Sequence, residues 1–144
     1  MLYDFKKCLG KNVKYGREVE NIVNNDPKSL WDKIDKHLTI HPKLIILATL
    51  IYTLRESKEL LDKFEIFSMY ETLRKKCNLD LSVKSFEEWL YMLVTCGFME
   101  KIKKGRKIYF KLAFPPKLLK EAMMMDPLMK SLMLSELTDQ NLYK

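Results

Sequence analysis

The sequence predicts a mainly α-helical protein that carries one small β-hairpin. Apolar residues recur every three or four positions through most of residues 24–97, Gly97 follows the last of these stretches, and apolar and basic residues then alternate over 99–112. Spacings of three and four indicate helices with one apolar face, whereas alternation indicates strands. Because glycine tolerates the left-handed conformation that ends many helices, Gly97 marks the change from helices to a hairpin.

Two helices are expected in the first part of the chain. Over 24–38, Asp26 is a suitable capping residue and Pro27 suits the first turn of a helix. The helix expected over 41–57 is apolar on most sides, which predicts that it is buried at the centre of the protein. Its most apolar run, 44–54, is too short to span a membrane.

Two further helices are expected before Gly97, over 63–78 and 79–97. Phe64 and Ile66 are interpreted as a short strand just before the first, and Ser82 is a favourable cap for the second. The second helix places its inward face on Phe86, Trp89, Leu90, Leu93 and Val94. Its outward positions are expected to be Lys84, Glu87, Glu88, Tyr91, Met92 and Thr95.

The hairpin is expected to consist of strands over 98–103 and 106–112, joined around Lys104-Gly105. Ile102, Ile108, Phe110 and Leu112 are expected to form its buried face, opposite a basic face. Three helices followed by a hairpin are the layout of a winged helix-turn-helix domain, here over 41–114, with the hairpin as its wing. Residues 1–40 are expected to form a helical lead-in. Residues 115–144 are expected to form a helical extension, either two helices split at Asp126-Pro127 or one bent helix.

Charge is concentrated near the hairpin. The net charge of the chain is +7, and residues 97–144 alone contribute ten basic and five acidic residues. A localised basic patch suits a polyanion such as nucleic acid, and the alternative is an ordinary solvated surface. Three widely separated cysteines favour a reducing compartment over a disulfide scaffold or a zinc site.

No pattern in the sequence indicates catalysis. The two histidines, His37 and His41, have no glutamate placed between them as in a zinc-protease motif, and the Gly10–Gly16 stretch lacks the Lys-Ser/Thr pair of a phosphate-binding loop. We therefore expect no enzymatic activity, no catalytic residue, no metal and no cofactor.

The wing is the principal candidate for binding DNA. A winged helix can place its third helix in the major groove while the wing lies along the phosphates, and lysines neutralise phosphates without reading base sequence. Two adjacent glutamates, Glu87 and Glu88, predict weak or absent base readout by the third helix. The candidate DNA-binding residues are Lys101, Lys103, Lys104, Arg106, Lys107 and Lys111 of the wing, with Ser82, Lys84 and Ser85 at the start of the third helix.

The methionine-rich C-terminal stretch contains more apolar residues than one helix face needs. Methionine is flexible and suits adaptable contact surfaces, so a surface for another subunit is one interpretation, and packing onto the helical core is the other. The candidate partner-binding residues are Leu118, Leu119, Met125, Leu128 and Met129.

Three stretches and a basic hairpin together resemble a known family. They are "HPKLIILATLI" (41–51), "FEIFSMYETLRKKCN" (64–78) and "LSVKSFEEWLYMLVTCGFMEK" (81–101), followed by the tail "PPKLLKEAMMMDPLMKSL" (115–132). In this order they resemble the C-terminal winged-helix domain of the origin recognition complex and archaeal replication-initiator family, over about residues 41–133. The stretch 64–76 is most similar to the fourth-subunit type.

The resemblance implies a DNA-binding module of a replication-initiation assembly. Such a module contacts double-stranded DNA through helix and wing, docks on neighbouring initiator subunits, has no membrane partner, and works in the nucleus, or in the cytoplasm where there is none. The lead-in would then correspond to the end of a lid domain. The chain departs from the family in lacking the ATPase domain and in carrying Glu87 and Glu88. The alternatives are a winged helix that binds only proteins, or a small transcription regulator. The second alternative would require a more basic third helix.

Overall fold

The computed structural model describes residues 26–80 and 83–142, with side chains for all of these except 83–84 and 139–142. In chain order it contains α2 (Pro27–His37), α3 (Ile40–Glu56), α4 (Lys63–Lys76), α5 (Val83–Thr95), β1 (Met99–Lys104), β2 (Lys107–Leu112), α6 (Pro116–Met123) and α7 (Pro127–Leu142). The prediction of a mainly helical fold with one hairpin, in winged-helix order, is confirmed. The part of the expected helical lead-in that precedes residue 26 lies outside the described residues.

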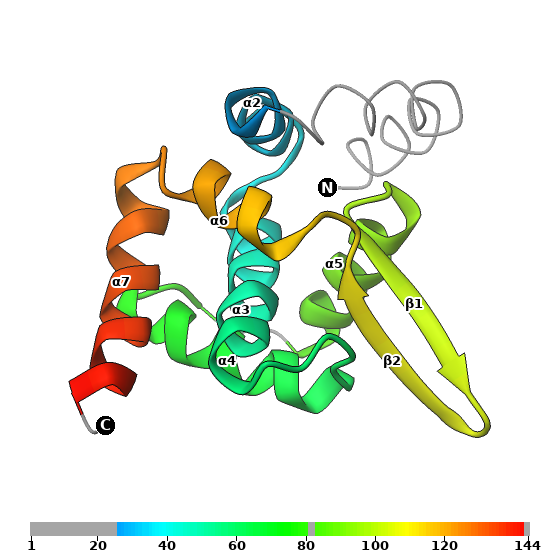
Figure 1. Ribbon diagram of the computed structural model, residues 1–144. Helices are drawn as coiled ribbons and strands as arrows, with labels where there is room; N and C mark the ends of the chain where they lie inside the picture. The colour runs from blue at the N-terminus through cyan, green and yellow to red at the C-terminus, as the bar shows by residue number, and fades with distance from the viewer. Residues whose placement is uncertain (1–25, 81–82, 143–144) are drawn as a thin grey trace.

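The helix α3 is the centre of the protein. Ten of its residues are buried, and α4, α5, α6, α7 and β2 all contact it, so that the other elements surround it (Figure 1). The buried hydroxyl of Thr49 donates to the carbonyl oxygen of Ile45 at 2.9 Å, which avoids the cost of leaving that hydroxyl unpaired. Within the described part of the chain, no helix has the length and apolar character needed to cross a membrane.

The helix α4 begins with a capping box. The Asp62 side chain accepts from the backbone N–H of Glu65 at 2.8 Å, and the Glu65 carboxylate accepts from the N–H of Asp62 at 3.0 Å. Burial disfavours the ionised form of Glu65, but hydrogen bonds from Lys58 and Asp62 outweigh it and lower the pKa of Glu65 below its usual value. The helix therefore starts at Lys63, and the expected short strand at Phe64 and Ile66 is wrong.

The extended segment that does pair with the wing lies just before this cap. Leu61 forms a bridge with Phe110, donating to its carbonyl at 2.9 Å and accepting from its N–H at 2.7 Å. Leu61 is fully buried. The backbone thus ties the start of α4 to β2, on the edge of β2 that β1 does not occupy.

The turn from α4 to α5 is held by an arginine. Asn78 adopts a left-handed conformation (φ 54°), and Arg74 donates to the carbonyl oxygen of Leu79 at 2.7 Å. The helix α5 then packs Phe86, Trp89, Leu90 and Leu93 into the core, as predicted, and Gly97 (φ 86°) follows its end. Val94 is only partly buried, and Met92, expected to face outward, is buried instead.

The register of the hairpin corrects the predicted faces. Lys104 pairs with Lys107, so the connecting residues are Gly105 (φ 63°) and Arg106, as in a type II′ turn. Across a two-residue turn, even-numbered residues of one strand lie opposite odd-numbered residues of the other. Ile102 is therefore opposite Tyr109, on the face away from Ile108, Phe110 and Leu112.

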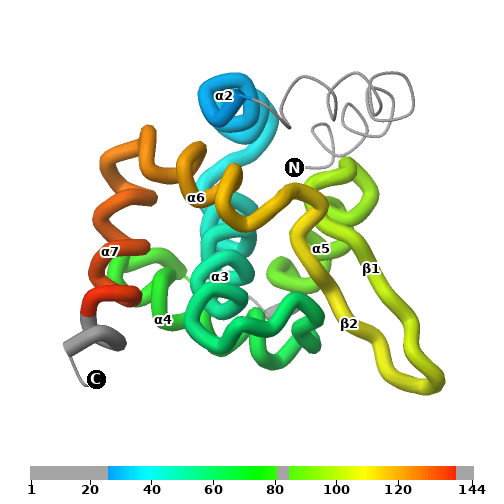
Figure 2. The backbone as a smooth tube through the Cα atoms, in the orientation of Figure 1, coloured from blue at the N-terminus to red at the C-terminus, as the bar shows by residue number. Residues whose placement is uncertain are grey.

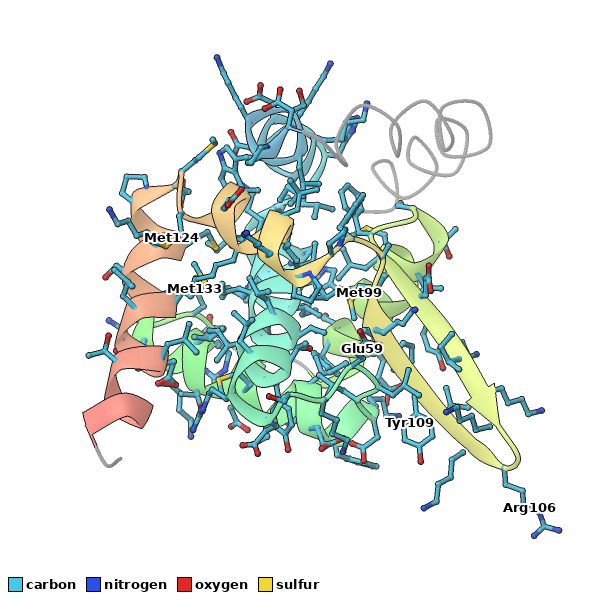
Figure 3. The ribbon with its side chains drawn as sticks, in the orientation of Figure 1. Glu59, Met99, Arg106, Tyr109, Met124 and Met133 are labelled. Carbon is cyan, nitrogen blue, oxygen red and sulfur yellow. The ribbon has the colours of Figure 1, made fainter. Side chains whose placement is uncertain are left out.

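The helix α6 crosses the core from the base of the wing, and α7 covers the side away from the wing (Figure 1). The chain passes from the hairpin into α6, which packs between α2 and α3, and α7 then runs beside α3, as the tube shows (Figure 2). Met133 is fully buried and points from α7 toward the interior (Figure 3). The predicted break at Asp126-Pro127 is confirmed, and residues from α2 to α7 share one hydrophobic core.

The capping box predicts a measurable loss of stability on substitution. Glu65→Ala should lower the free energy of unfolding by about 1 kcal/mol, because the N–H of Asp62 loses its acceptor. Glu65→Gln should lose much less, since glutamine still accepts at this position and only the partly exposed ion pair with Lys58 is lost. Urea denaturation followed by circular dichroism measures both. Equal losses in the two variants would contradict the capping role.

Candidate nucleic-acid interface

The tip of the wing carries four exposed basic residues. Lys103, Lys104, Arg106 and Lys107 surround the turn, and Arg106 points away from the rest of the protein (Figure 3). Among residues 26–80 and 83–142, no acidic group pairs with any of these four. The structure thus brings four of the six predicted wing cations together, with their charges available to a ligand.

The other two predicted cations, Lys101 and Lys111, lie nearer the base of the hairpin on opposite faces. Lys111 pairs with Glu100 at 3.6 Å, where both side chains are partly exposed. Lys101 places its ammonium 5.2 Å from the centre of the Tyr91 ring. Both contacts are of the weak, solvent-exposed kind, worth up to about 1 kcal/mol, so either lysine can exchange its partner for a phosphate.

The wing is fixed at its base and free at its tip. Met99, Phe110 and Leu112 are buried at the base, and the backbone of Phe110 is also bonded to Leu61. Toward the tip, Ile108 is 41% exposed although it shares a face with Phe110. The hairpin extends from the end of α5 to the edge of the molecule, clear of the helices (Figure 1). A rigid base with a projecting charged tip is suited to reaching along a nucleic-acid backbone.

The helix α5 presents two glutamates on its solvent-facing side. Glu87 forms an ion pair with Lys63 of α4 at 2.9 Å, and Glu88 is exposed. Lys63 therefore neutralises the charge of one of the two glutamates that disfavour contact between α5 and the major groove. Ser85 lies in the first turn of α5 and is partly buried. The predicted contacts of Ser82 and of the Lys84 side chain lie outside the described residues.

A second feature of this side of the molecule is its exposed aromatic rings. Phe64 is 75% exposed and Tyr91 is 44% exposed. The ammonium of Lys63 lies 5.7 Å from the centre of the Phe64 ring and pairs with Glu87 of α5. Tyr91 lies one turn after Glu87, and its ring contacts Phe110 edge-on, with the two ring centroids 6.5 Å apart. We call this the aromatic–lysine surface; it comprises Lys63, Phe64, Tyr91, Lys101, Lys103 and Ile108.

Sequence reasoning missed this surface, although part of it was detectable. Tyr91 was expected to face outward, and it does. Phe64 was assigned to a strand, yet a helix that buries Ile66, Tyr70 and Leu73 places residue 64 on the opposite face. An apolar ring left in water forgoes about 2 kcal/mol of burial, so its exposure on α4 is informative.

A histidine at the start of α3 contacts both α4 and α5. The His41 ring, at the start of α3, stacks on Trp89 of α5 with centroids 4.4 Å apart and planes 6° apart. Its Nδ1 is 2.7 Å from the hydroxyl oxygen of Tyr70 in α4. Burial, together with the nearby charge of Arg74, lowers the pKa of His41, whereas burial raises the pKa of Tyr70 to about 12. Tyr70 therefore keeps its proton and can donate to the neutral imidazole.

The candidate partner-binding residues divide into two groups. Leu118, Leu119 and Met129 are buried in the protein's own core, so their prediction as partner contacts is wrong. They face inward because α6 packs between α2 and α3 and α7 packs on α3. Met125 is 50% exposed and Leu128 is 44% exposed, where α6 passes into α7. These two remain available to another protein.

Comparison of the chain with protein-family models, with curated proteins and with solved structures finds no match. The assignment of a function therefore depends on the fold and on the chemistry of the wing and its surroundings.

The histidine contact predicts a loss of stability in mild acid. Because the pKa of His41 is lowered in the folded chain, the unfolded chain takes up the proton first as the pH falls through about 6.5. The stabilisation is fully present above that pH and is lost below it. The melting temperature should fall between pH 7.5 and pH 5.5, and His41→Phe, which keeps the stacking on Trp89, should show a smaller fall. The same fall in both proteins would contradict this role.

Proposed function

We propose that this protein is a DNA-binding winged-helix module that holds double-stranded DNA by its phosphate backbone through the wing. The observation that carries the proposal is a group of four exposed basic residues at the tip of a hairpin whose base is buried, with no acidic partner in the part of the chain that the structure describes. Each cation that meets a phosphate releases condensed counterions, which favours binding at moderate salt. The fixed base of the hairpin also reduces the entropy lost when the tip is ordered on DNA.

The chemistry of this side of the molecule favours binding without strong sequence preference. Three of the four tip cations are lysines, which contact phosphate as point charges and do not read base edges. On α5, the exposed Glu88 repels phosphate, and Glu87 is occupied by Lys63. Arg106 at the tip is the residue best suited to enter a narrow minor groove.

The resemblance of residues 41–133 to the winged-helix domains of replication initiators supports placing this module in an origin-recognition or initiator assembly. In that setting the module docks on other subunits as well as on DNA. Met125 and Leu128 are the exposed apolar residues of the predicted partner surface, and Leu134 on α7 is 41% exposed as well. The same residues are compatible with the alternative, a winged helix that binds only proteins, so DNA binding is the property that separates the two.

The test is DNA binding by a variant with Lys103, Lys104, Arg106 and Lys107 all changed to Ala. The parent should bind a random-sequence duplex with a slope of about −3 to −4 in a plot of log affinity against log salt, since four phosphates are neutralised at about −0.9 each. The quadruple variant should lose most of this slope. Fluorescence anisotropy at four or more salt concentrations measures it.

A matched control removes the same charge elsewhere. Lys36, Lys117, Lys120 and Lys130 are exposed on α2, α6 and α7, away from the wing. Changing these four to Ala lowers the net charge equally and should leave most of the slope in place. If both variants bind as the parent does, or lose equal parts of the slope, the wing is not the DNA-binding element and the proposal fails.

A further inference from the structure

We propose that the aromatic–lysine surface binds unpaired bases of single-stranded nucleic acid, with Phe64 and Tyr91 stacking on bases and the neighbouring lysines contacting phosphates. The inference rests on the proposed function, from which it takes the class of ligand, a nucleic acid. It adds the form of that ligand and a contact region that includes Phe64 and Tyr91 and shares only Lys103 with the four cations of the tip.

The two rings are available and are held by different elements. Phe64 projects from the first turn of α4, where the capping box fixes the backbone, and three-quarters of it is exposed. Tyr91 projects from the middle of α5, and its edge-on contact with the buried Phe110 orients its ring. Both rings project from helical backbone, so each presents a preformed platform on which a base can stack.

Cations lie beside both rings. Lys63 is next to Phe64, and Lys101 lies over Tyr91. Lys103 follows on the same face of the hairpin as Lys101 and leads to the cations of the tip. The contact between Lys101 and Tyr91 is solvent-exposed and weak, so a phosphate can draw the ammonium aside and leave the ring to a base.

This combination suits single strands better than duplexes. Aromatic rings interleaved with cations are the means by which proteins hold single-stranded DNA or RNA, because every base has a flat face that can stack. In a duplex the faces of the bases are stacked on one another, and only their edges are accessible in the grooves. Exposed rings therefore contribute little to duplex binding and much to the binding of an unpaired strand.

The experiment compares two probes, a thymidine 20-mer and a random-sequence 20-base-pair duplex, by fluorescence anisotropy with the full chain. Phe64→Leu and Tyr91→Leu keep an apolar side chain but remove the stacking ring. Each should weaken binding to the single strand about tenfold and change binding to the duplex less than twofold. Tyr91→Phe keeps the ring and should bind both probes as the parent does.

A control for exposed apolar surface is available on the far side of the molecule. Leu134 lies on α7, opposite the hairpin (Figure 1), and Leu134→Ala should leave both affinities unchanged. Photocrosslinking of a 5-iodouridine-substituted single strand adds a direct readout, since crosslinks should map to the peptides that contain Phe64 or Tyr91. Crosslinks confined to other peptides would overturn the inference.

The remaining outcomes separate this inference from the proposed function. Unchanged single-strand affinity in both leucine variants, with the salt slope still lost in the wing variant, overturns the inference and leaves the proposed function in place. The reverse pattern overturns the proposed function alone. Equal losses of affinity for both probes would show that the rings support the wing, and would overturn the inference. A change of self-association in sedimentation without a change in DNA binding would show that the rings contact a second copy of the chain, and would overturn it as well.

Discussion

Burial of α3 on every side is the constraint on which the rest of the structure depends. A helix that is apolar around most of its circumference cannot remain in water, and here its residues from Leu44 to Ile51 are all buried. Each covering element reaches it with one apolar face, which leaves the opposite face of that element for solvent or a ligand. The exposed sides of α4, α5 and the wing are therefore consequences of how α3 is covered.

The wing depends on this core at one end only. Its base is joined to the core by Phe110, which packs inward and pairs through its backbone with Leu61, immediately before the capping box of α4. Because a two-stranded hairpin is marginally stable by itself, this pairing is what makes the wing a defined element. The tip has no such support and carries charge in place of apolar residues, so it can contact a ligand without loss of core packing.

The two parts of the candidate interface differ in the physical property that they offer. The tip of the wing offers positive charge, which acts over a distance of about 8 Å at physiological salt and does not require a fixed geometry. The aromatic–lysine surface offers ring faces, which act only in contact and require the fixed positions that α4 and α5 provide. In the two proposals, charge brings a nucleic acid to the surface and stacking selects its form.

The sequence by itself determined the element order, the breaks at Gly97 and Asp126-Pro127, and the cations of the hairpin, because periodicity, capping residues and charge are local properties. Only the tertiary structure decided which face each element presents. The two-residue turn placed Ile102 on the face of the hairpin away from Ile108, and the packing of α6 and α7 buried Leu118, Leu119 and Met129. The capping box set the start of α4 so that Phe64 faces outward beside Lys63. These outcomes depend on register and on contacts between segments distant in the chain, which no local pattern contains.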